Sequence, residues 1–413
     1  MSRFSVAEKL SVLADAAKYD ASCASSGGRK RDSRTGKGVG SVTGSGVCHA
    51  YAPDGRCISL LKILLTNYCM FDCVYCVNRI SSNVRRARFS VAEIVALTLD
   101  FYKRNYIEGL FLSSGIIRSP DYTMELLVRV ARTLRETHDF RGYIHLKTIP
   151  DADPLLLEQA GLYADRLSIN VELPSESSLT KLAPQKRMPA IRRSMAGLKL
   201  KIEDSKDARR ASRKAPVFAP AGQSTQMIVG ADAATDVDVL TSSAQLYASY
   251  GLRRVYYSAF LPIPDSSTAL PLQAPPLVRE HRLYQADWLL RFYDFTLDEV
   301  ASATEKGMFD NRIDPKLAWA LANPALFPVD INRAPREMLL RIPGLGVRAV
   351  DRLIQARRHG AVRLIDLDRV TRSAARLQPF VLAADWRPAD QPDPARLREK
   401  FAAPPSQLDL FAA

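Results

Sequence analysis

Between Cys57 and Phe260 the sequence alternates short apolar runs with longer amphipathic segments, and this alternation constrains the fold more than any other feature. The apolar runs are typical of buried strands and the amphipathic segments of surface helices. The predicted strands are residues 59–65, 109–113, 143–147, 167–171, 225–229 and 254–258, and the predicted helices are 91–104, 124–137, 154–160, 190–201 and 236–250. Six β/α alternations predict an α/β fold with a parallel sheet, either doubly wound or a partial (β/α)6 TIM-type barrel. In both, the functional groups gather at the carboxyl ends of the strands.

Composition divides the rest of the chain. An N-terminal helix is followed at residues 21–47 by a stretch rich in Gly, Ser, Lys and Arg, which cannot bury a core and is expected to be a flexible basic loop. Residues 203–222 are expected to be an exposed excursion from the barrel. The predicted parts are 1–56 (helix and basic loop), 57–325 (barrel), 326–386 (a small all-α domain) and 387–413 (a Pro-rich tail, disordered up to its last residues).

The charge balance indicates an anionic partner. Lys and Arg total 58 against 44 Asp and Glu, a net charge of +14, which favours nucleic acid ahead of a membrane surface; the alternative is a solvated basic surface. No apolar run is long enough to span a bilayer, and the charged N-terminus lacks a secretory apolar core, so we expect a cytoplasmic protein. In that reducing compartment, 6 cysteines are more typical of metal ligation than of a disulfide framework.

Three of the cysteines, Cys69, Cys73 and Cys76, form a C-x3-C-x2-C sequence directly after the first predicted strand. Three thiolates can hold three irons of a cubane cluster and leave the fourth iron open to another ligand. Zinc is the alternative, but it needs four ligands, and the fourth would have to come from Cys48 or His49.

The spacing of these cysteines, with the aromatic Tyr75 just before the last one, resembles the signature of the radical S-adenosylmethionine (SAM) superfamily. The resemblance implies a [4Fe–4S] cluster held by the three cysteines, bound SAM, and a reducing electron donor. It also implies reductive cleavage of SAM to methionine and a 5′-deoxyadenosyl radical that abstracts a hydrogen atom from the substrate. Cys23, Cys48 and Cys57 could hold a second cluster, but their wide spacing favours ordinary buried or loop thiols.

The same resemblance assigns a SAM-binding turn to Ser113, Ser114 and Gly115 at the end of the second predicted strand. Glycine permits close backbone approach and the serines supply acceptors, although a plain strand-to-helix turn would have the same composition.

Further cofactor contacts are predicted on the fourth strand, where Ser168, Asn170 and Glu172 alternate and would share one face. Polar groups on the inner face of an apolar strand need partners, which the ribose and methionine ends of SAM would provide. Gly230 ends the fifth strand at a similar rim. Lys147 ends the third, where it would contact substrate or form a structural salt bridge.

In the C-terminal part, two predicted helices flank a turn that contains Gly344 and Gly346, whose backbone N–H groups can converge on an anion at a helix N-terminus. The segment resembles a helix–hairpin–helix, the module that grips a DNA phosphate without reading sequence, with Arg341, Arg348 and Arg352 as flanking charges. The alternative is a protein-binding helical pair.

The tail contains Gln407, Leu408, Leu410 and Phe411, which resemble the peptide that docks bacterial repair proteins on the DNA polymerase sliding clamp. The alternative is a tail helix packed on the barrel.

Together these features resemble a bacterial family of DNA modification or repair radical SAM proteins that is linked with a uracil-DNA-glycosylase-like partner. The resemblance implies an enzyme that acts on duplex DNA through its phosphate backbone. Two alternatives stay open: a non-catalytic iron–sulfur protein that binds DNA or senses redox state and recruits the glycosylase-like partner, and an RNA-modifying radical SAM enzyme.

Overall fold

The computed structural model describes residues 4–17, 47–51, 57–263, 267–371, 374–389 and 393–402. The predictions for Cys23 and for the clamp-binding peptide lie outside these residues, as does nearly all of the predicted loop at 21–47. The chain divides into two compact units, one of residues 1–233 and 245–275, the other of residues 234–244 and 276–413. The second unit therefore begins before residue 326, the predicted start of the C-terminal domain.

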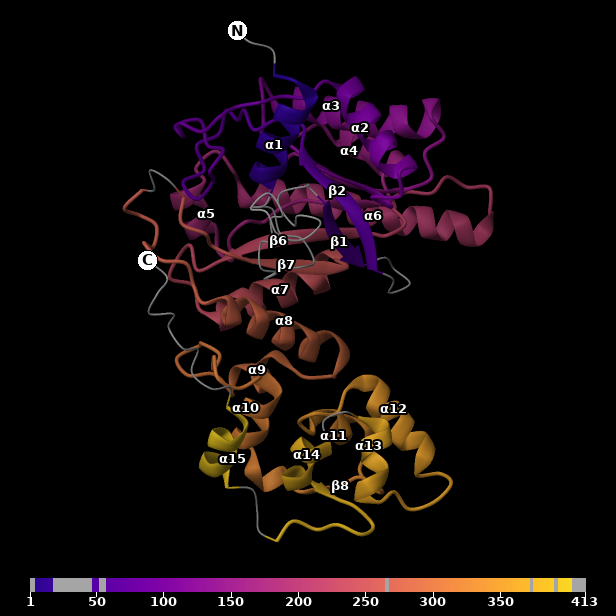
Figure 1. Cartoon of the computed structure of the whole chain (residues 1–413), viewed down its shortest axis with the longest axis vertical. Coiled ribbons are helices and arrows are strands. Elements are labelled where there is room, and N and C mark those ends of the chain that lie inside the picture. The colour runs from indigo at the N-terminus through magenta and orange to yellow at the C-terminus, as the bar shows by residue number, and fades with distance from the viewer. Residues whose placement is uncertain are drawn as a thin grey trace, which may run out of the picture. The chain divides into compact units, whose positions relative to one another are not determined.

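The first unit contains a seven-stranded sheet in the order β1-β2-β3-β4-β5-β6-β7. The strands are β1 (Val47–Tyr51), β2 (Cys57–Leu64), β3 (Gly109–Ser113), β4 (Tyr143–Lys147), β5 (Arg166–Ser168), β6 (Gln223–Val229) and β7 (Arg254–Ala259). Strands β2 to β7 are parallel, which confirms the six predicted strands. Because the strand order never reverses, the sheet curls into a half-barrel rather than a doubly wound sheet (Figure 1).

The sheet has one strand that the sequence did not reveal. β1 pairs antiparallel with β2, from Val47 opposite Leu61 to Tyr51 opposite Cys57. We predicted only a helix and a loop before residue 57, because a five-residue strand bordered by Gly-rich sequence has too few apolar positions to stand out.

The helices of the first unit follow the predicted order, with α5 (Glu176–Leu182) as an additional helix that was not predicted. They are α1 (Val6–Ala16), α2 (Val91–Lys103), α3 (Pro120–Arg132), α4 (Pro154–Tyr163), α5 (Glu176–Leu182) and α6 (Met188–Ala211), and α7 (Asp236–Tyr250) crosses the division between the units. Capping boxes start α1 and α2. None of the described helices is long and apolar enough to cross a membrane.

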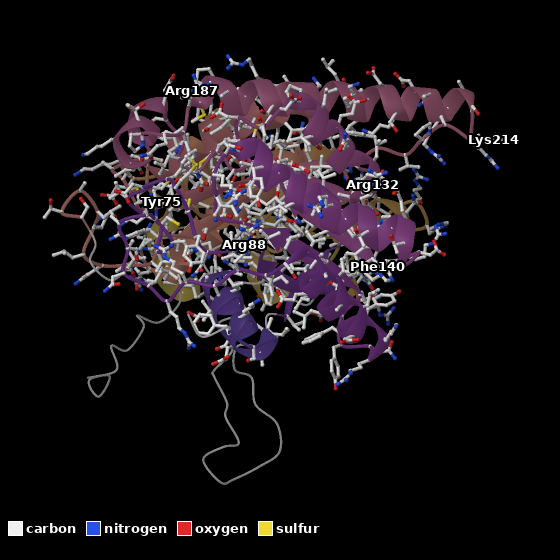
Figure 2. All side chains as sticks on the ribbon, turned by 90° about the horizontal axis from the view of Figure 1, so that it is seen from above. Tyr75, Arg88, Arg132, Phe140, Arg187 and Lys214 are labelled. Carbon is white, nitrogen blue, oxygen red and sulfur yellow. The ribbon has the colours of Figure 1, made fainter. Side chains whose placement is uncertain are left out.

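Helix α6 corrects the predicted excursion at 203–222, because its helical turns continue to Ala211. Its last buried residue is Ile202, so strong helix formers rather than core contacts carry the final turns. The following loop folds back, with Ser205 and Arg209 donating hydrogen bonds to the carbonyls of Pro216 and Ala215. Figure 2 shows this helix running along one side of the molecule between Arg187 and Lys214.

The second unit is mainly helical. Its elements after α7 are α8 (Leu277–Phe292), α9 (Leu297–Ala301), α10 (Pro315–Ala322), β8 (Val329–Asp330), α11 (Arg336–Arg341), α12 (Val347–Ala356), α13 (Leu367–Val370), α14 (Ala374–Leu377), β9 (Val381–Leu382) and α15 (Pro394–Phe401). Its core contains a series of edge-to-face ring contacts that joins Phe295, Trp319, Phe327 and Phe380.

Helix α15 lies in the tail that we predicted to be disordered, so that prediction was wrong for residues 394–401. Asp393 caps the helix, Leu397 is buried, and the Glu399 carboxylate pairs with Arg312 at 3.2 Å. The Pro-rich composition concealed an Asp-Pro helix start, which favours a helix N-terminus as much as a break.

Candidate functional site

A cavity of about 190 Å³ lies in the first unit at the carboxyl ends of the parallel strands. It brings together most of the predicted cluster and SAM residues: Cys69, Cys73, Tyr75, Cys76, Ser113, Ser114, Gly115, Lys147, Asn170 and Glu172. Ser168 and Gly230 do not line it. The chemistry-bearing residues therefore meet where parallel strands present their ends.

Backbone donors orient two of the three thiols. The Cys69 Sγ accepts hydrogen bonds from the N–H groups of Phe71 (3.4 Å) and Ile116 (3.5 Å), and the Cys76 Sγ accepts one from Asn78 (3.4 Å). Burial raises the pKa of the Cys73 thiol and, with the neighbouring Cys73, raises the pKa of Cys76 to about 12. The thiolate forms are therefore costly here unless a metal compensates their charge.

Cys69, Cys73 and Cys76 line the same cavity, so each thiol can bind a different iron of one cluster. Among the described residues, no group of three His, Cys, Asp or Glu side chains is placed to hold a single metal ion.

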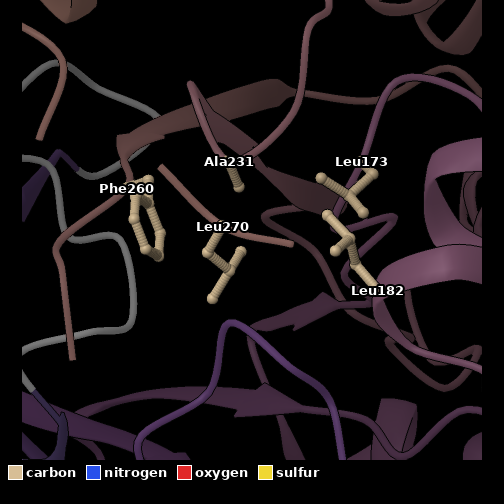
Figure 3. Packing of buried hydrophobic residues seen from close by; sticks show 5 residues of the cluster. All are labelled: Leu173, Leu182, Ala231, Phe260 and Leu270. Atoms are coloured by element: carbon tan, nitrogen blue, oxygen red, sulfur yellow. The ribbon is translucent and has the colours of Figure 1, made fainter. Parts of the chain in front are cut away.

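An apolar cluster supports the cysteine loop from below. It comprises Leu173, Leu182, Ala231, Phe260 and Leu270 (Figure 3), and Val74 and Tyr75 of the loop pack against it. Tyr75 is the predicted aromatic residue of the signature, and burial raises its pKa well above the usual value, so the hydroxyl stays neutral. Packing of the two residues between Cys73 and Cys76 thus holds the loop against the barrel.

The Arg86 guanidinium closes the cysteine loop. It donates hydrogen bonds to four backbone carbonyls, those of Asn67, Asn78 (2.8 Å), Arg79 (2.6 Å) and Ser82 (2.9 Å). These carbonyls lie on either side of the three cysteines in sequence, so one planar fork joins both ends of the loop. Arg86 is therefore a positioning residue for the thiols, which the sequence analysis did not identify.

We expect Arg86→Lys to lower the iron content to well below that of the wild type. The single ammonium group of lysine cannot donate hydrogen bonds to the four carbonyls on both sides of the cysteine loop at once. Iron per chain after anaerobic purification measures this. Arg85→Lys is the matched control, since the Arg85 guanidinium lies over the Phe4 ring and 3.8 Å from Glu8. Equal iron in Arg86→Lys and wild type would contradict the positioning role.

The turn at 113–115 requires its glycine. A Cβ at Gly115 would lie 2.3 Å from the Tyr68 carbonyl oxygen, and the Gly115 N–H donates to the Thr66 carbonyl at 2.8 Å. The Ser114 hydroxyl donates to the Gly115 carbonyl at 2.6 Å. This close approach brings the turn beside the cysteine loop, where the predicted SAM contact is required.

A buried polar network lines the cavity opposite the thiols. The Asn170 amide donates to Glu172 (3.4 Å) and Gln226 (3.3 Å), and the Lys147 ammonium donates to the same Gln226 oxygen at 3.4 Å. The Lys186 Nζ lies 2.6 Å from the Glu172 Oε1. Burial alone would lower the pKa of Lys186, but the Glu172 carboxylate outweighs it and raises the pKa.

Two members of this network, Gln226 and Lys186, were missed. Gln226 lies on β6, which reads Gln-Ser-Thr-Gln-Met-Ile-Val, and nothing in the sequence distinguishes it from the polar residues before it. Lys186 belongs to the segment between α5 and α6, and only the fold brings it to Glu172. Lys147, which ends the third predicted strand, belongs to this network through its hydrogen bond to Gln226.

Ser168, which we predicted to share a strand face with Asn170 and Glu172, ends β5 and does not line the cavity, and Glu172 leaves the extended conformation with φ 65°. Ser168 instead lies 2.9 Å from the ring nitrogen Nε2 of His145, whose pKa burial lowers well below the usual value. Gly230 takes a left-handed conformation with φ 80° at the end of β6. Its role is therefore to turn the chain.

In the second unit, α11 and α12 flank the predicted glycine turn. Gly344 has φ 89°, which favours glycine, and the N–H groups of Gly344 and Gly346 form no hydrogen bond within the described residues. Arg348 and Arg352 are exposed. Arg341 is not: its guanidinium pairs with Glu299 (2.8 and 2.9 Å) and lies over the Phe295 ring, so this geometry removes Arg341 from the predicted DNA contacts.

The buried Lys316 and the half-buried Tyr293 contact the glycine turn and the start of α12. The Lys316 Nζ donates to the Leu345 carbonyl at 2.6 Å and lies 4.8 Å from the Tyr293 ring centroid. The Tyr293 hydroxyl accepts a hydrogen bond from the Val347 N–H at the start of α12. Burial lowers the pKa of Lys316 to about 7, although Asp314 opposes that shift.

This pKa predicts a pH-dependent stability. Lys316 binds its proton more weakly in the folded chain (pKa about 7) than in the unfolded chain, where the usual value is 10.5, so the free energy of unfolding should rise as pH rises between these values. Urea unfolding at several pH values, for wild type and Lys316→Met, checks this. The rise attributable to Lys316 should disappear in the variant, and identical pH profiles would contradict a buried titrating lysine.

Comparison with known proteins agrees with this geometry. Residues 63–241 match the family model described as the radical SAM superfamily. A search of curated proteins found no match. Similar solved structures include the [FeFe]-hydrogenase maturase HydG from Carboxydothermus hydrogenoformans (15% identity over 53% of this chain and 48% of that chain, TM-score 0.40) and methylornithine synthase (17%, 54% and 60%, TM-score 0.39). A third is a radical SAM methyltransferase from Sphaerobacter thermophilus (15%, 58% and 65%, TM-score 0.40).

This chain thus spans less than two thirds of each of these structures. The family uses a [4Fe–4S] cluster and SAM as cofactors, and the residues of the cavity fit both. Three thiols around one cavity suit the cluster, and a close-approach glycine turn with a buried polar network suits the amino acid and ribose of SAM. Residues 63–241 therefore form a radical SAM superfamily domain.

Proposed function

We propose that this chain is a radical SAM enzyme that acts on DNA in modification or repair. The observation that carries the DNA proposal is the glycine turn of the second unit. The N–H groups of Gly344 and Gly346, which have no hydrogen-bond partner among the described residues, lie just before helix α12, whose exposed Arg348 and Arg352 add positive charge, in the same chain as the cysteine cavity. Such a turn is suited to a phosphate and not to a base edge, so binding would be independent of sequence.

The cluster and SAM, when bound, supply one-electron reduction of the sulfonium and a 5′-deoxyadenosyl radical for hydrogen abstraction. Cys69, Cys73 and Cys76 would hold the cluster, while Ser113, Gly115, Asn170 and Glu172 would orient SAM. The apolar cluster beneath the loop limits access of water to the thiols. A non-catalytic sensor has no use for a buried polar network beside an open iron, which favours an enzyme over that alternative.

Three partners belong to the proposal. A reducing electron donor would reduce the cluster, and a uracil-DNA-glycosylase-like protein would act on the same DNA. The sliding clamp would bind the tail residues Gln407, Leu408, Leu410 and Phe411. An RNA substrate is the second candidate, and the phosphate-directed glycine turn disfavours it.

The test measures the 5′-deoxyadenosine that the anaerobically reconstituted full chain forms from SAM. Dithionite serves as the reductant, and the reaction is run with and without duplex DNA or RNA. We expect duplex DNA to stimulate the reaction. DNA binding without any 5′-deoxyadenosine would favour the sensor, and stimulation by RNA alone would favour RNA modification.

Point variants suit the binding assay better than truncation at residue 330, which would cut through the second unit. Arg348→Ala and Arg352→Ala should each reduce the slope of log affinity against log salt by about one, for any duplex sequence. Arg358→Ala, also exposed but at the other end of α12, is the matched control. Unchanged slopes would favour a protein-binding helical pair.

A further inference from the structure

Arg88 follows the cysteine loop and differs from the two arginines just before it. Arg85 faces Glu8 and Phe4, and Arg86 binds four carbonyls. Arg88 is exposed, and its guanidinium donates a hydrogen bond to the Tyr122 hydroxyl at 3.1 Å. A tyrosine hydroxyl directs the guanidinium without neutralising its charge.

Arg118 approaches the same tyrosine. Its guanidinium lies 4.6 Å from the Tyr122 ring centroid, and that of Arg88 lies 5.8 Å from it. Neither arginine forms an ion pair with a carboxylate within the part of the chain that the structure describes. Two uncompensated cations held on one ring repel each other, so the arrangement is suited to an anion that contacts both.

The backbone conformation of Arg118 indicates that its side chain has a function. Arg118 has φ 60°, a left-handed conformation that non-glycine residues rarely adopt. Strained residues of this kind cluster at binding sites, where the surrounding structure holds a side chain in a required direction. Glycine would suit this backbone better, so an arginine here indicates that the side chain is needed.

The pair lies at the edge of the barrel that carries the cofactor cavity. Arg88 forms a β-bridge with Thr66, just after β2, and Arg118 follows Ile116, which lines the cavity and donates to the Cys69 Sγ. Arg88 and Tyr75 of the cysteine loop are both labelled in Figure 2. A ligand held by both arginines would therefore be anchored near the reacting end of the barrel.

We propose that Arg88, Arg118 and Tyr122 form a phosphate clamp that anchors the substrate beside the cofactor cavity. Two guanidinium groups present parallel N–H donors to the non-bridging oxygens of a phosphate, and Tyr122 sets their spacing. Asp121 accepts a hydrogen bond from the Asp153 N–H at 2.7 Å, and Glu125, whose charge acts on Tyr122, is exposed and forms no ion pair with Arg88 or Arg118 within the described residues. We assign the phosphate to a DNA phosphodiester, and this assignment rests on the proposed function. A phosphorylated small molecule would present the same phosphate oxygens to the clamp.

The test uses the anaerobically reconstituted full chain, a labelled duplex oligonucleotide and inorganic pyrophosphate. The variants are Arg88→Gln and Arg118→Gly, with Arg85→Gln as the matched control. Each clamp variant should raise the Kd for both probes by about threefold to tenfold and reduce the salt slope for DNA by about one. Iron content should stay at the wild-type value, and Arg118→Gly should not lower the thermal midpoint because glycine suits a φ of 60°.

The outcomes separate the clamp from the DNA proposal. Weaker binding of both probes supports the clamp with DNA as the source. Weaker pyrophosphate binding with unchanged oligonucleotide binding supports the clamp with a small phosphorylated substrate and counts against DNA. If neither probe distinguishes the clamp variants from Arg85→Gln, the phosphate clamp is overturned, whatever the glycine-turn variants show.

Discussion

Wild-type protein purified without oxygen should contain about four irons per chain, and Cys69→Ala, Cys73→Ala and Cys76→Ala should each contain almost none. The reason is the absence of any substitute ligand. The cavity offers three thiols and no converging set of His, Asp or Glu side chains among the described residues. Two remaining thiols, at least one of them with a pKa raised by burial, cannot compensate the charge of the cluster.

Cys48→Ala is the control for this result. Cys48 lies on β1 with a half-buried thiol and does not line the cavity. The variant should keep the full iron content and the visible absorption of the cluster. Zinc in place of iron in the anaerobic wild type would contradict the radical SAM assignment of the site, and loss of iron in Cys48→Ala would indicate a ligand outside the cysteine loop.

The strands of the barrel were predictable because a parallel sheet buries both faces, so each strand is a nearly continuous apolar run. β3, for example, reads Gly-Leu-Phe-Leu-Ser and is buried along its whole length. Elements that rest on other forces were not predictable in this way. β1 depends on its partner β2, the end of α6 on helix propensity, and α15 on a cap and ion pairs.

The same distinction separates the site residues that the sequence predicts from those that it does not. The three cysteines could be found from their local spacing, and the turn at Gly115 from the family resemblance; the demand for glycine there comes from Tyr68, which only the fold brings close. Lys186 and Arg86 could not be found, because a lysine or arginine in a loop is usually solvated, and only the tertiary structure gives each its partners. The error at Arg341 has the same cause, since its partner Glu299 belongs to α9, far away in the sequence.

The Glu172–Lys186 pair leads to the second large prediction. The two charged atoms are 2.6 Å apart, and the side chains are 9% and 13% exposed. Removing one member of a buried ion pair leaves the other charge uncompensated, which typically costs about 3–5 kcal/mol. We therefore expect Glu172→Gln to lower the free energy of unfolding of the apo chain by about this amount, measured by urea unfolding in the absence of oxygen.

The double variant Glu172→Gln/Lys186→Met separates stability from cofactor binding. It removes both charges, so most of the lost stability should return, because replacing a whole buried ion pair is often close to neutral. SAM binding should not return, since the Glu172 carboxylate that faces the cavity beside Asn170 is still missing. Equilibrium dialysis against SAM with the cluster in place measures this. If the double variant regains SAM affinity together with stability, Glu172 stabilises the barrel and is not part of the cofactor site.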